Sequence, residues 1–179
     1  MRALSENLNT LIVEENPADQ FLLEQLASSK FKIGKIFSVP TVKQAKEILE
    51  SSDINIVLLD LSLPDSFGID SITSIHSLIQ RTPVIILTGL ADGGVPLEAL
   101  RKQNAQDYVV KSELNTNLLI KSIEYSIERK KAEEKIIASE EKYRQMFHKN
   151  SFPMWINDEN TLQILEVKDA ANVTAWRLC

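Results

Sequence analysis

The strongest structural signal in this chain is the stretch Ile54-Asn55-Ile56-Val57-Leu58-Leu59-Asp60-Leu61-Ser62-Leu63-Pro64-Asp65. Its first part is a short apolar run that ends in one carboxylate, a pattern typical of a buried strand that delivers an acid to a cleft. Three other short apolar runs also end in functional side chains: Glu14 and Glu15 after 11–13, Thr88 after 84–87, and Lys111 after 108–110. Acids, a hydroxyl and an amine at strand tips predict a site that handles a phosphoryl group beside a divalent cation.

Strand and helix signals alternate from residue 11 to residue 128. Strands are expected at 11–13, 33–39, 54–60, 83–88 and 107–110. Alternating βα units predict an α/β fold, a flavodoxin-like (βα)5 doubly wound parallel sheet with helices on both faces. The commonest order of such a sheet is 2-1-3-4-5, and ligands bind at its switch point between strands 1 and 3. That order places Glu14 and Glu15 beside Asp60.

The helices between these strands are marked by caps and by apolar spacing. Asn16 and Pro17 start a helix whose buried face is predicted to hold Phe21, Leu22, Leu23 and Leu26. Thr41 caps a second helix, and a third is expected over 68–78. A loop with Gly93 and Gly94 precedes a short helix through Leu97 and Leu100, which Asn104 ends.

A long helix is expected from about Leu114 to about Phe147, because this stretch contains neither proline nor glycine. Its middle, 128–135, is charged all round with opposite charges four residues apart, which indicates a solvated rod or one strand of a helical pair. Two further strands are expected at 152–156 and 162–167, joined by a turn at 158–161. A segment of roughly 40 residues is too short to bury a core of its own.

The bulk composition narrows the classes of function. The chain has 179 residues and a net charge of −5, which argues against a nucleic-acid-binding surface. No apolar stretch approaches the roughly 20 residues of a membrane span, and the N-terminus lacks the apolar core of a signal peptide, so a cytoplasmic protein is expected. Cys179 is the only cysteine, and His76 and His148 are far apart. A metal would therefore have oxygen ligands, which points to Mg²⁺ or Mn²⁺.

Residues 8–128 resemble the receiver domain of two-component response regulators. The resemblance is carried by Leu-Ile-Val-Glu14-Glu15-Asn-Pro, Leu-Leu-Asp60-Leu-Ser-Leu-Pro-Asp, Gly68, Leu-Thr88-Gly and Asp-Tyr108-Val-Val-Lys111, in the family's order. It implies that Asp60 accepts a phosphoryl group from a histidine kinase or phosphotransfer protein. It also implies that Glu14, Glu15, Asp60 and the backbone carbonyl of Ser62 hold Mg²⁺. Lys111 and Thr88 would contact the phosphoryl oxygens, and Thr88 and Tyr108 would form the switch.

Two departures from the family pattern concern the metal and the backbone. Receivers usually carry aspartate where this chain has Glu15, and the longer side chain changes where an ion can sit. They also usually have Lys-Pro, often with a cis bond, where this chain has Lys111-Ser112. A cis bond without proline costs roughly 2.5–4 kcal/mol, so a trans bond is expected here.

The C-terminal part, from about Ser139, resembles the opening of a PAS sensor domain. Tyr143, Phe147, Pro153, Trp155 and Val167 lie in the segments that carry this resemblance. The expected organisation is a receiver domain over 1–128, a helical linker over 129–148 and a truncated PAS-like segment over 149–179. A receiver followed by PAS is typical of hybrid signalling proteins, some of which end in a histidine kinase, and a homodimer through the long helix fits this organisation.

Three alternatives to a phosphorylated switch stay open. The first is a degenerate receiver that acts only in interaction or dimerisation, which Glu15 motivates. The second is a phosphatase of the haloacid dehalogenase type, but this family needs a second aspartate where Ser62 stands. The third is a flavodoxin, but this family needs a Ser/Thr/Gly-rich phosphate loop after the first strand, where this chain has Glu14 and Glu15. As a receiver, the chain would not be an enzyme beyond the phosphorylation and dephosphorylation of Asp60.

Overall fold

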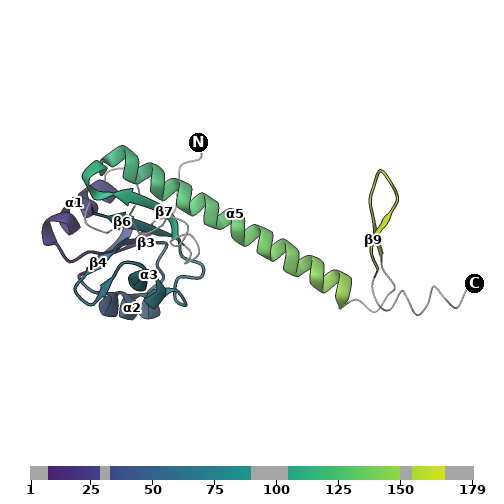
Figure 1. Ribbon diagram of the computed structural model, residues 1–179, viewed down its shortest axis with the longest axis horizontal. Coiled ribbons are helices and arrows are strands. Elements are labelled where there is room, and N and C mark those ends of the chain that lie inside the picture. Colours follow the sequence, from purple (N-terminus) through teal and green to yellow (C-terminus); the bar gives the residue numbers. More distant parts are fainter. Residues whose placement is uncertain (1–7, 29–32, 90–104, 150–154, 168–179) are drawn as a thin grey trace, which may run out of the picture. The chain divides into compact units, whose positions relative to one another are not determined.

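The computed structural model describes residues 8–28, 33–89, 105–149 and 155–167. A five-stranded parallel sheet forms its centre, in the order β2-β1-β3-β6-β7. The strands are β1 (Leu8–Val13), β2 (Ile33–Val39), β3 (Ile56–Asp60), β6 (Val84–Thr88) and β7 (Ala105–Val110) (Figure 1). This is the flavodoxin-like 2-1-3-4-5 order that the sequence predicts.

The register of the sheet brings the carboxyl ends of its central strands to one edge. Val13, the last residue of β1, pairs with Leu59 of β3, and Asp60 pairs with Leu87 of β6. Thr88 in turn pairs with Val110 at the end of β7. The residues at and just after these strand ends, Glu14 among them, therefore meet at a single edge.

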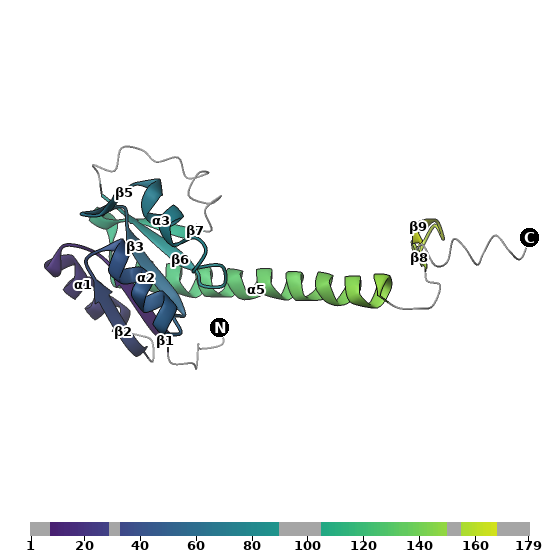
Figure 2. The ribbon, with the colours of Figure 1, turned by 90° about the horizontal axis from the view of Figure 1, so that it is seen from below.

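Helices cover both faces of the sheet. Helices α2 (Val42–Ser51) and α3 (Ile69–Ile75) lie on one face, and α1 (Pro17–Ser28) and α5 (Thr116–His148) lie on the other (Figures 1 and 2). Alternate residues of β3 face opposite sides, so Val57 and Leu59 belong to one core and Ile56 and Leu58 to the other. All four are fully buried, and each contributes roughly 1.5–3 kcal/mol of stability.

The predicted caps of α1 and α2 are confirmed. The Asn16 side chain accepts a hydrogen bond from the amide of Ala18, and the Thr41 hydroxyl accepts one from the amide of Gln44. The predicted buried face of α1 is partly wrong, because Phe21 and Leu22 are exposed. Successive helical residues are about 100° apart around the helix axis. A helix that turns Leu23 and Ala27 toward the sheet therefore turns Phe21 and Leu22 toward solvent.

One helix bound differs from the prediction, one hairpin was not predicted, and the features expected between Gly93 and Asn104 lie outside the described residues. Helix α3 ends at Ile75, before the predicted residue 78, and a turn follows. The hairpin of β4 (Ser62–Leu63) and β5 (Ser66–Phe67) was not predicted, because two-residue strands show no alternation. The Gly93-Gly94 loop, the short helix through Leu97 and Leu100, and Asn104 lie outside the described residues.

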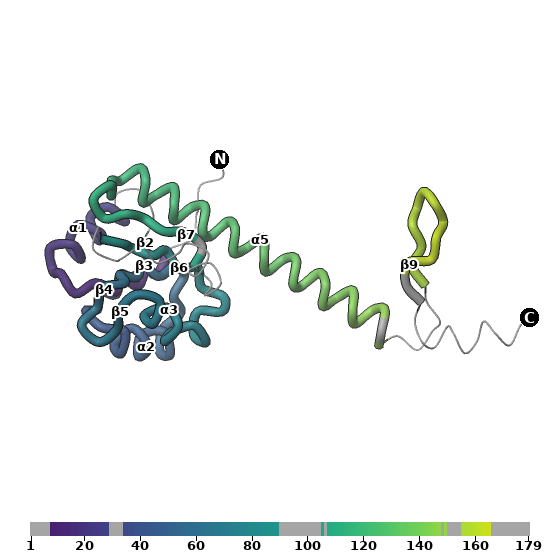
Figure 3. The backbone as a smooth tube through the Cα atoms, in the orientation of Figure 1, coloured from purple at the N-terminus to yellow at the C-terminus, as the bar shows by residue number. Residues whose placement is uncertain are grey.

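The chain divides into two compact units, residues 1–132 and 133–179. Among the described residues of the second unit are the end of α5 and an antiparallel hairpin of β8 (Trp155–Asn157) and β9 (Ile164–Val167) (Figure 3). The Asp158 carboxylate holds the turn, because it accepts hydrogen bonds from Asn160 and Thr161. The predicted hairpin is confirmed over its described residues, although its second strand begins at Ile164 and not at residue 162, and Trp155 is exposed on it. Residues 152–154 of the first predicted strand lie outside the described residues. In the described part of the chain, no helix is both long and apolar enough to cross a membrane.

Candidate phosphoryl-transfer site

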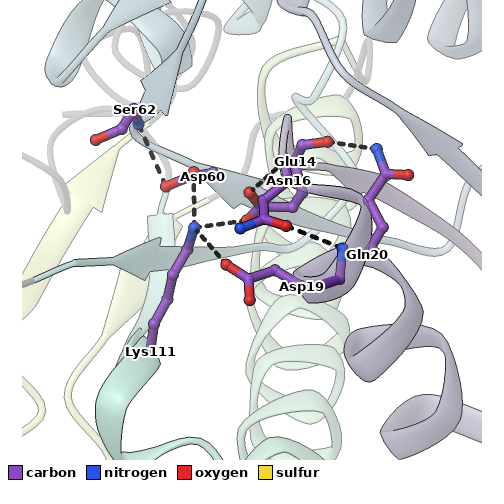
Figure 4. A network of polar contacts seen from close by, with 8 residues as sticks. Glu14, Asn16, Asp19, Gln20, Asp60, Ser62 and Lys111 are labelled. Atoms are coloured by element: carbon purple, nitrogen blue, oxygen red, sulfur yellow. Dashed lines mark hydrogen bonds and ion pairs between the residues drawn. The ribbon is translucent and has the colours of Figure 1, made fainter.

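Two buried carboxylates and one amine meet at the carboxyl edge of the sheet. Glu14 directly follows β1, Asp60 ends β3, and only 1% and 2% of their side-chain surfaces are exposed. The ammonium of Lys111, which directly follows β7, lies 2.6 Å from Glu14 Oε2 and 2.8 Å from Asp60 Oδ2 (Figure 4). Glu14, Asp60 and Lys111 are called the carboxylate–lysine cluster below. The sequence predicts that these three residues meet at one edge of the sheet, and the structure brings them together there.

Backbone amides hold the two carboxylates in place. The amide of Asn16 donates to Glu14 Oε1 at 3.0 Å, and the amide of Ser62 donates to Asp60 Oδ1 at 3.2 Å. The Gln20 side chain donates to the backbone carbonyl of Glu14, so the first turn of α1 is tied to the end of β1. In each acid, one carboxylate oxygen thus accepts a hydrogen bond from a backbone amide and the other contacts the Lys111 ammonium.

The electrostatics of the cluster follow from burial and from this pairing. Burial raises the pKa of Glu14, opposed by the hydrogen bonds from Lys111 and Asn16 and assisted by the nearby charge of Asp60. Burial alone would lower the pKa of Lys111, but its hydrogen bonds and charge attraction to Asp60 and Glu14 outweigh this and raise the pKa to about 12. Lys111 therefore stays charged at neutral pH, as a counter-ion to both acids.

The other residues singled out in the sequence lie around this cluster. Thr88 is half-buried at the end of β6, the strand between β3 and β7. Tyr108 lies on β7 opposite Ile86, with 44% of its surface exposed. Glu15 is exposed, and within the described ranges it has no hydrogen bond or ion pair with the cluster. The Lys111–Ser112 bond is trans, as expected, since no cis bond occurs in the described chain.

Two aspartates near the site were missed by the sequence reasoning. Asp19, in the first turn of α1, has its Oδ2 atom 3.6 Å from the Lys111 ammonium. Asp65 accepts hydrogen bonds from the amides of Val42 and Lys43, at 3.0 and 2.9 Å, at the start of α2. The signal for Asp19 was an acid at the third position of the helix that begins at Pro17, shortly after Glu14. Asp65 stands in the motif of residues 58–65, but its contact with α2 has no signal in the sequence, because its partners lie more than 20 residues away.

The Asp65 contact connects the loop after Asp60 to helix α2. Slight burial alone would raise the pKa of Asp65, but its bonds from the amides of Lys43 and Val42 lower it. Together with Thr41, Asp65 satisfies the first three amides of α2, which have no partner inside the helix. The loop is also closed by a hydrogen bond from the amide of Gly68 to the carbonyl of Leu61, at 2.8 Å.

The donor chemistry of the site fits Mg²⁺. No group of three or more His, Cys, Asp or Glu side chains arranged to hold a metal is found in the described segments. Mg²⁺ needs less than that, because it usually binds one or two carboxylates and keeps several waters. Glu14 and Asp60 supply two carboxylates close enough to share one cation, now the Lys111 ammonium.

The comparisons with known proteins point to one family. A family model described as "Response regulator receiver domain" matches residues 10–124. The response regulator protein PilR of Pseudomonas aeruginosa is 32% identical over 101 residues, which are 56% of this chain and 22% of PilR. The transcriptional regulatory protein BasR of Escherichia coli is 34% identical over 108 residues, 58% of this chain and 46% of BasR. The chain thus spans less than half the length of either relative.

Solved structures agree on the fold. The signal receiver domain of a LuxO repressor protein from Vibrio parahaemolyticus has a TM-score of 0.61 at 27% identity, covering 73% of this chain and 98% of that one. A CheY-like receiver domain protein from Methanospirillum hungatei has a TM-score of 0.61 at 23% identity, covering 72% and 99%. Both match nearly whole chains of known structure.

Proposed function

Because this chain belongs to the family of response regulator receiver domains, we propose that it is the phosphoacceptor switch of a two-component phosphorelay, with Asp60 as the acceptor. The observation that carries the proposal is the position of Asp60. It is buried at the carboxyl end of the central strand and paired with Lys111 at 2.8 Å. A buried carboxylate at a strand end, held beside the Lys111 ammonium, is positioned to act as a nucleophile.

The proposed reaction is the transfer of a phosphoryl group from a phosphohistidine. A carboxylate oxygen of Asp60 forms a bond to phosphorus while the bond from phosphorus to the imidazole nitrogen breaks, and the electron pair stays on that nitrogen. An anion here attacks an anion, so catalysis consists mostly of positioning and charge neutralisation. Lys111 would pair with a phosphoryl oxygen, and the Thr88 hydroxyl would donate to another. Thr88 and Tyr108 would then pass the change to the surface of β6 and β7.

The same proposal assigns the residues for a divalent cation. Glu14, Glu15, Asp60 and the backbone carbonyl of Ser62 would hold Mg²⁺, and Mn²⁺ would suit the same oxygen donors. When bound, the cation neutralises charge on the transferred group. The two buried carboxylates support this assignment most directly, and Glu15 would have to turn inward from its exposed position. The chemistry would be confined to the phosphorylation and dephosphorylation of the chain's own Asp60, so the receiver would not be an enzyme beyond these two steps.

The test is phosphorylation by a small donor such as phosphoramidate in the presence of Mg²⁺. Intact-mass spectrometry should show the gain of one phosphoryl group by the wild-type chain and no gain by Asp60→Asn. Asp53→Asn, at an exposed aspartate outside the site, is the matched control and should label like the wild type. Labelling of Asp60→Asn would show that the acceptor assignment is wrong.

A degenerate receiver is the second candidate, and a specific observation favours it. Lys111 occupies both buried carboxylates while Glu15 faces outward. A chain that kept this arrangement would not bind Mg²⁺ and would serve only as an interaction or dimerisation module. The same experiment separates the two, because this candidate predicts no mass gain in either protein at any Mg²⁺ concentration.

The partners and the domain organisation belong to the same proposal. A histidine kinase or phosphotransfer protein would be the donor, in the cytoplasm. Residues 1–128 would be the receiver, 129–148 a helical linker and 149–179 an incomplete PAS-like segment, whose described residues 155–167 include the β8–β9 hairpin. The linker exposes apolar side chains, which supports a homodimer through α5; they are Ile136, Ile137, Tyr143 and Met146.

A further inference from the structure

The Lys111 ammonium faces three carboxylates, one more than the carboxylate–lysine cluster contains. Asp19 Oδ2 lies 3.6 Å away, against 2.6 Å for Glu14 and 2.8 Å for Asp60 (Figure 4). The exposed fractions separate the three, because the Asp19 side chain is 41% exposed while the other two are buried. Asp19 is therefore a carboxylate at the solvent side of the same ammonium.

The position of Asp19 is fixed by the first turn of α1. The amide of Gln20 donates to the carbonyl of Asn16 at 2.9 Å, and the Gln20 side chain donates to the carbonyl of Glu14. These two bonds hold the helix start against the end of β1. An acid in a first helical turn also stabilises the positive end of the helix, but that role does not require the carboxylate to face Lys111.

A divalent cation and the Lys111 ammonium need the same two buried oxygen donors. When Glu14 and Asp60 bind the cation, the ammonium loses most of its pairing and is repelled by the new charge. Of the three carboxylates around it, only Asp19 then remains available. An ammonium paired with Asp19 would stay at the edge of the site, within reach of a phosphoryl group on Asp60.

We propose that Asp19 is a positioning residue that retains the Lys111 ammonium beside the site when a divalent cation takes over Glu14 and Asp60. The inference rests on the proposed function, since it assumes that this site binds Mg²⁺. Asp19 then contributes more to the cation-bound state than to the free state, so its removal weakens cation binding. Partly exposed ion pairs of this kind change an equilibrium constant by about two- to fivefold.

The test measures Mg²⁺ affinity directly, by isothermal titration of the whole chain with MgCl₂. Asp19→Asn should raise the dissociation constant about two- to fivefold relative to the wild type. Asp70→Asn is the matched control, because Asp70 is an exposed acid in the first turn of α3 and its loss changes the net charge equally. It should leave the dissociation constant unchanged, and circular dichroism melts should show that both variants fold.

A double-mutant cycle shows whether Asp19 acts through Lys111. In a Lys111→Ala background, Asp19→Asn should no longer change the Mg²⁺ dissociation constant. A change that persists there would mean that Asp19 acts on the cation itself, and would overturn the proposal. An unchanged constant in the single variant would also overturn it while leaving the proposed function intact. If the wild type bound no Mg²⁺ and took no phosphoryl group, both proposals would fail.

Discussion

At the scale of single residues, the site depends on one amine that serves two buried acids. Glu14 and Asp60 come from neighbouring strands, and without Lys111 they would be like charges in a low-dielectric environment. Strand ends and sheet order were enough to predict that these three residues meet. They were not enough to predict that Asp19 contacts Lys111 or that Glu15 is exposed, because both depend on side-chain conformation near the start of α1.

Lys111→Ala should destabilise the metal-free protein and bind Mg²⁺ more tightly. The variant leaves two buried carboxylates without their cation, and we expect a loss of about 1–3 kcal/mol in the free energy of unfolding, less than for a fully buried pair because Lys111 is a quarter exposed. Mg²⁺ should restore much of this loss, because binding to the folded state alone adds about 2.7 kcal/mol at a hundred times the dissociation constant.

Urea unfolding with and without MgCl₂ measures both effects of Lys111→Ala. Lys121→Ala, at an exposed lysine of α5, is the control and should match the wild type. Equal stability of Lys111→Ala and the wild type without metal would mean that the two acids do not need the amine, and would argue against the electrostatic role given to Lys111.

At the scale of elements, the strand order was predictable and the finer packing was not. Short apolar runs and the rule for βα units fix a parallel order with few alternatives. The error on α1 arose because Phe21, Leu22 and Leu23 are all apolar, so the sequence does not show which of them faces the sheet. The β4–β5 hairpin and its Asp65 contact escaped because they depend on tertiary hydrogen bonds.

Asp65→Ala should destabilise helix α2 in a pH-dependent way. The variant leaves the amides of Val42 and Lys43 without their cap, and loss of a helix cap costs about 1 kcal/mol. The folded-state pKa of Asp65 is lowered, so its contribution is present above its ordinary value of 3.8 and is lost as the pH falls through the lower folded value. The difference from the wild type should therefore be largest at neutral pH and shrink in acid.

Urea unfolding at pH 7 and near pH 3 measures the Asp65 effect, with Asp53→Ala as an exposed control that caps no helix. A difference between Asp65→Ala and the wild type that stayed constant over this range would show that the carboxylate charge is not involved.

For the molecule as a whole, the charged second half of α5 matters because it exposes apolar side chains. Its apolar residues were too sparse for a heptad assignment from sequence. In the structure the helix buries Ile123 and Ile127 in the core of the sheet, whereas Ile136 and Ile137 are 60% and 55% exposed. Such exposed apolar side chains on a long helix fit pairing with a second copy.

The double variant Ile136→Glu/Ile137→Glu should therefore shift the chain toward monomer. Sedimentation equilibrium should give a concentration-dependent dimer for the wild type and a lower association constant for the variant, because like charges would face each other across the helices. Lys135→Glu, at a neighbouring exposed position, should change association less. A wild type that stays monomeric at all concentrations would contradict a dimer through α5.

The position of Trp155 on the β8–β9 hairpin has a practical consequence for spectroscopy. The chain has two tryptophans, Trp155 and Trp176, and both follow residue 132, where the first unit ends. The emission of Trp155 therefore arises outside the sheet that carries Asp60. An emission melt follows the second unit, a far-ultraviolet melt is dominated by the first, and a mismatch between their midpoints would reveal that the two parts unfold separately.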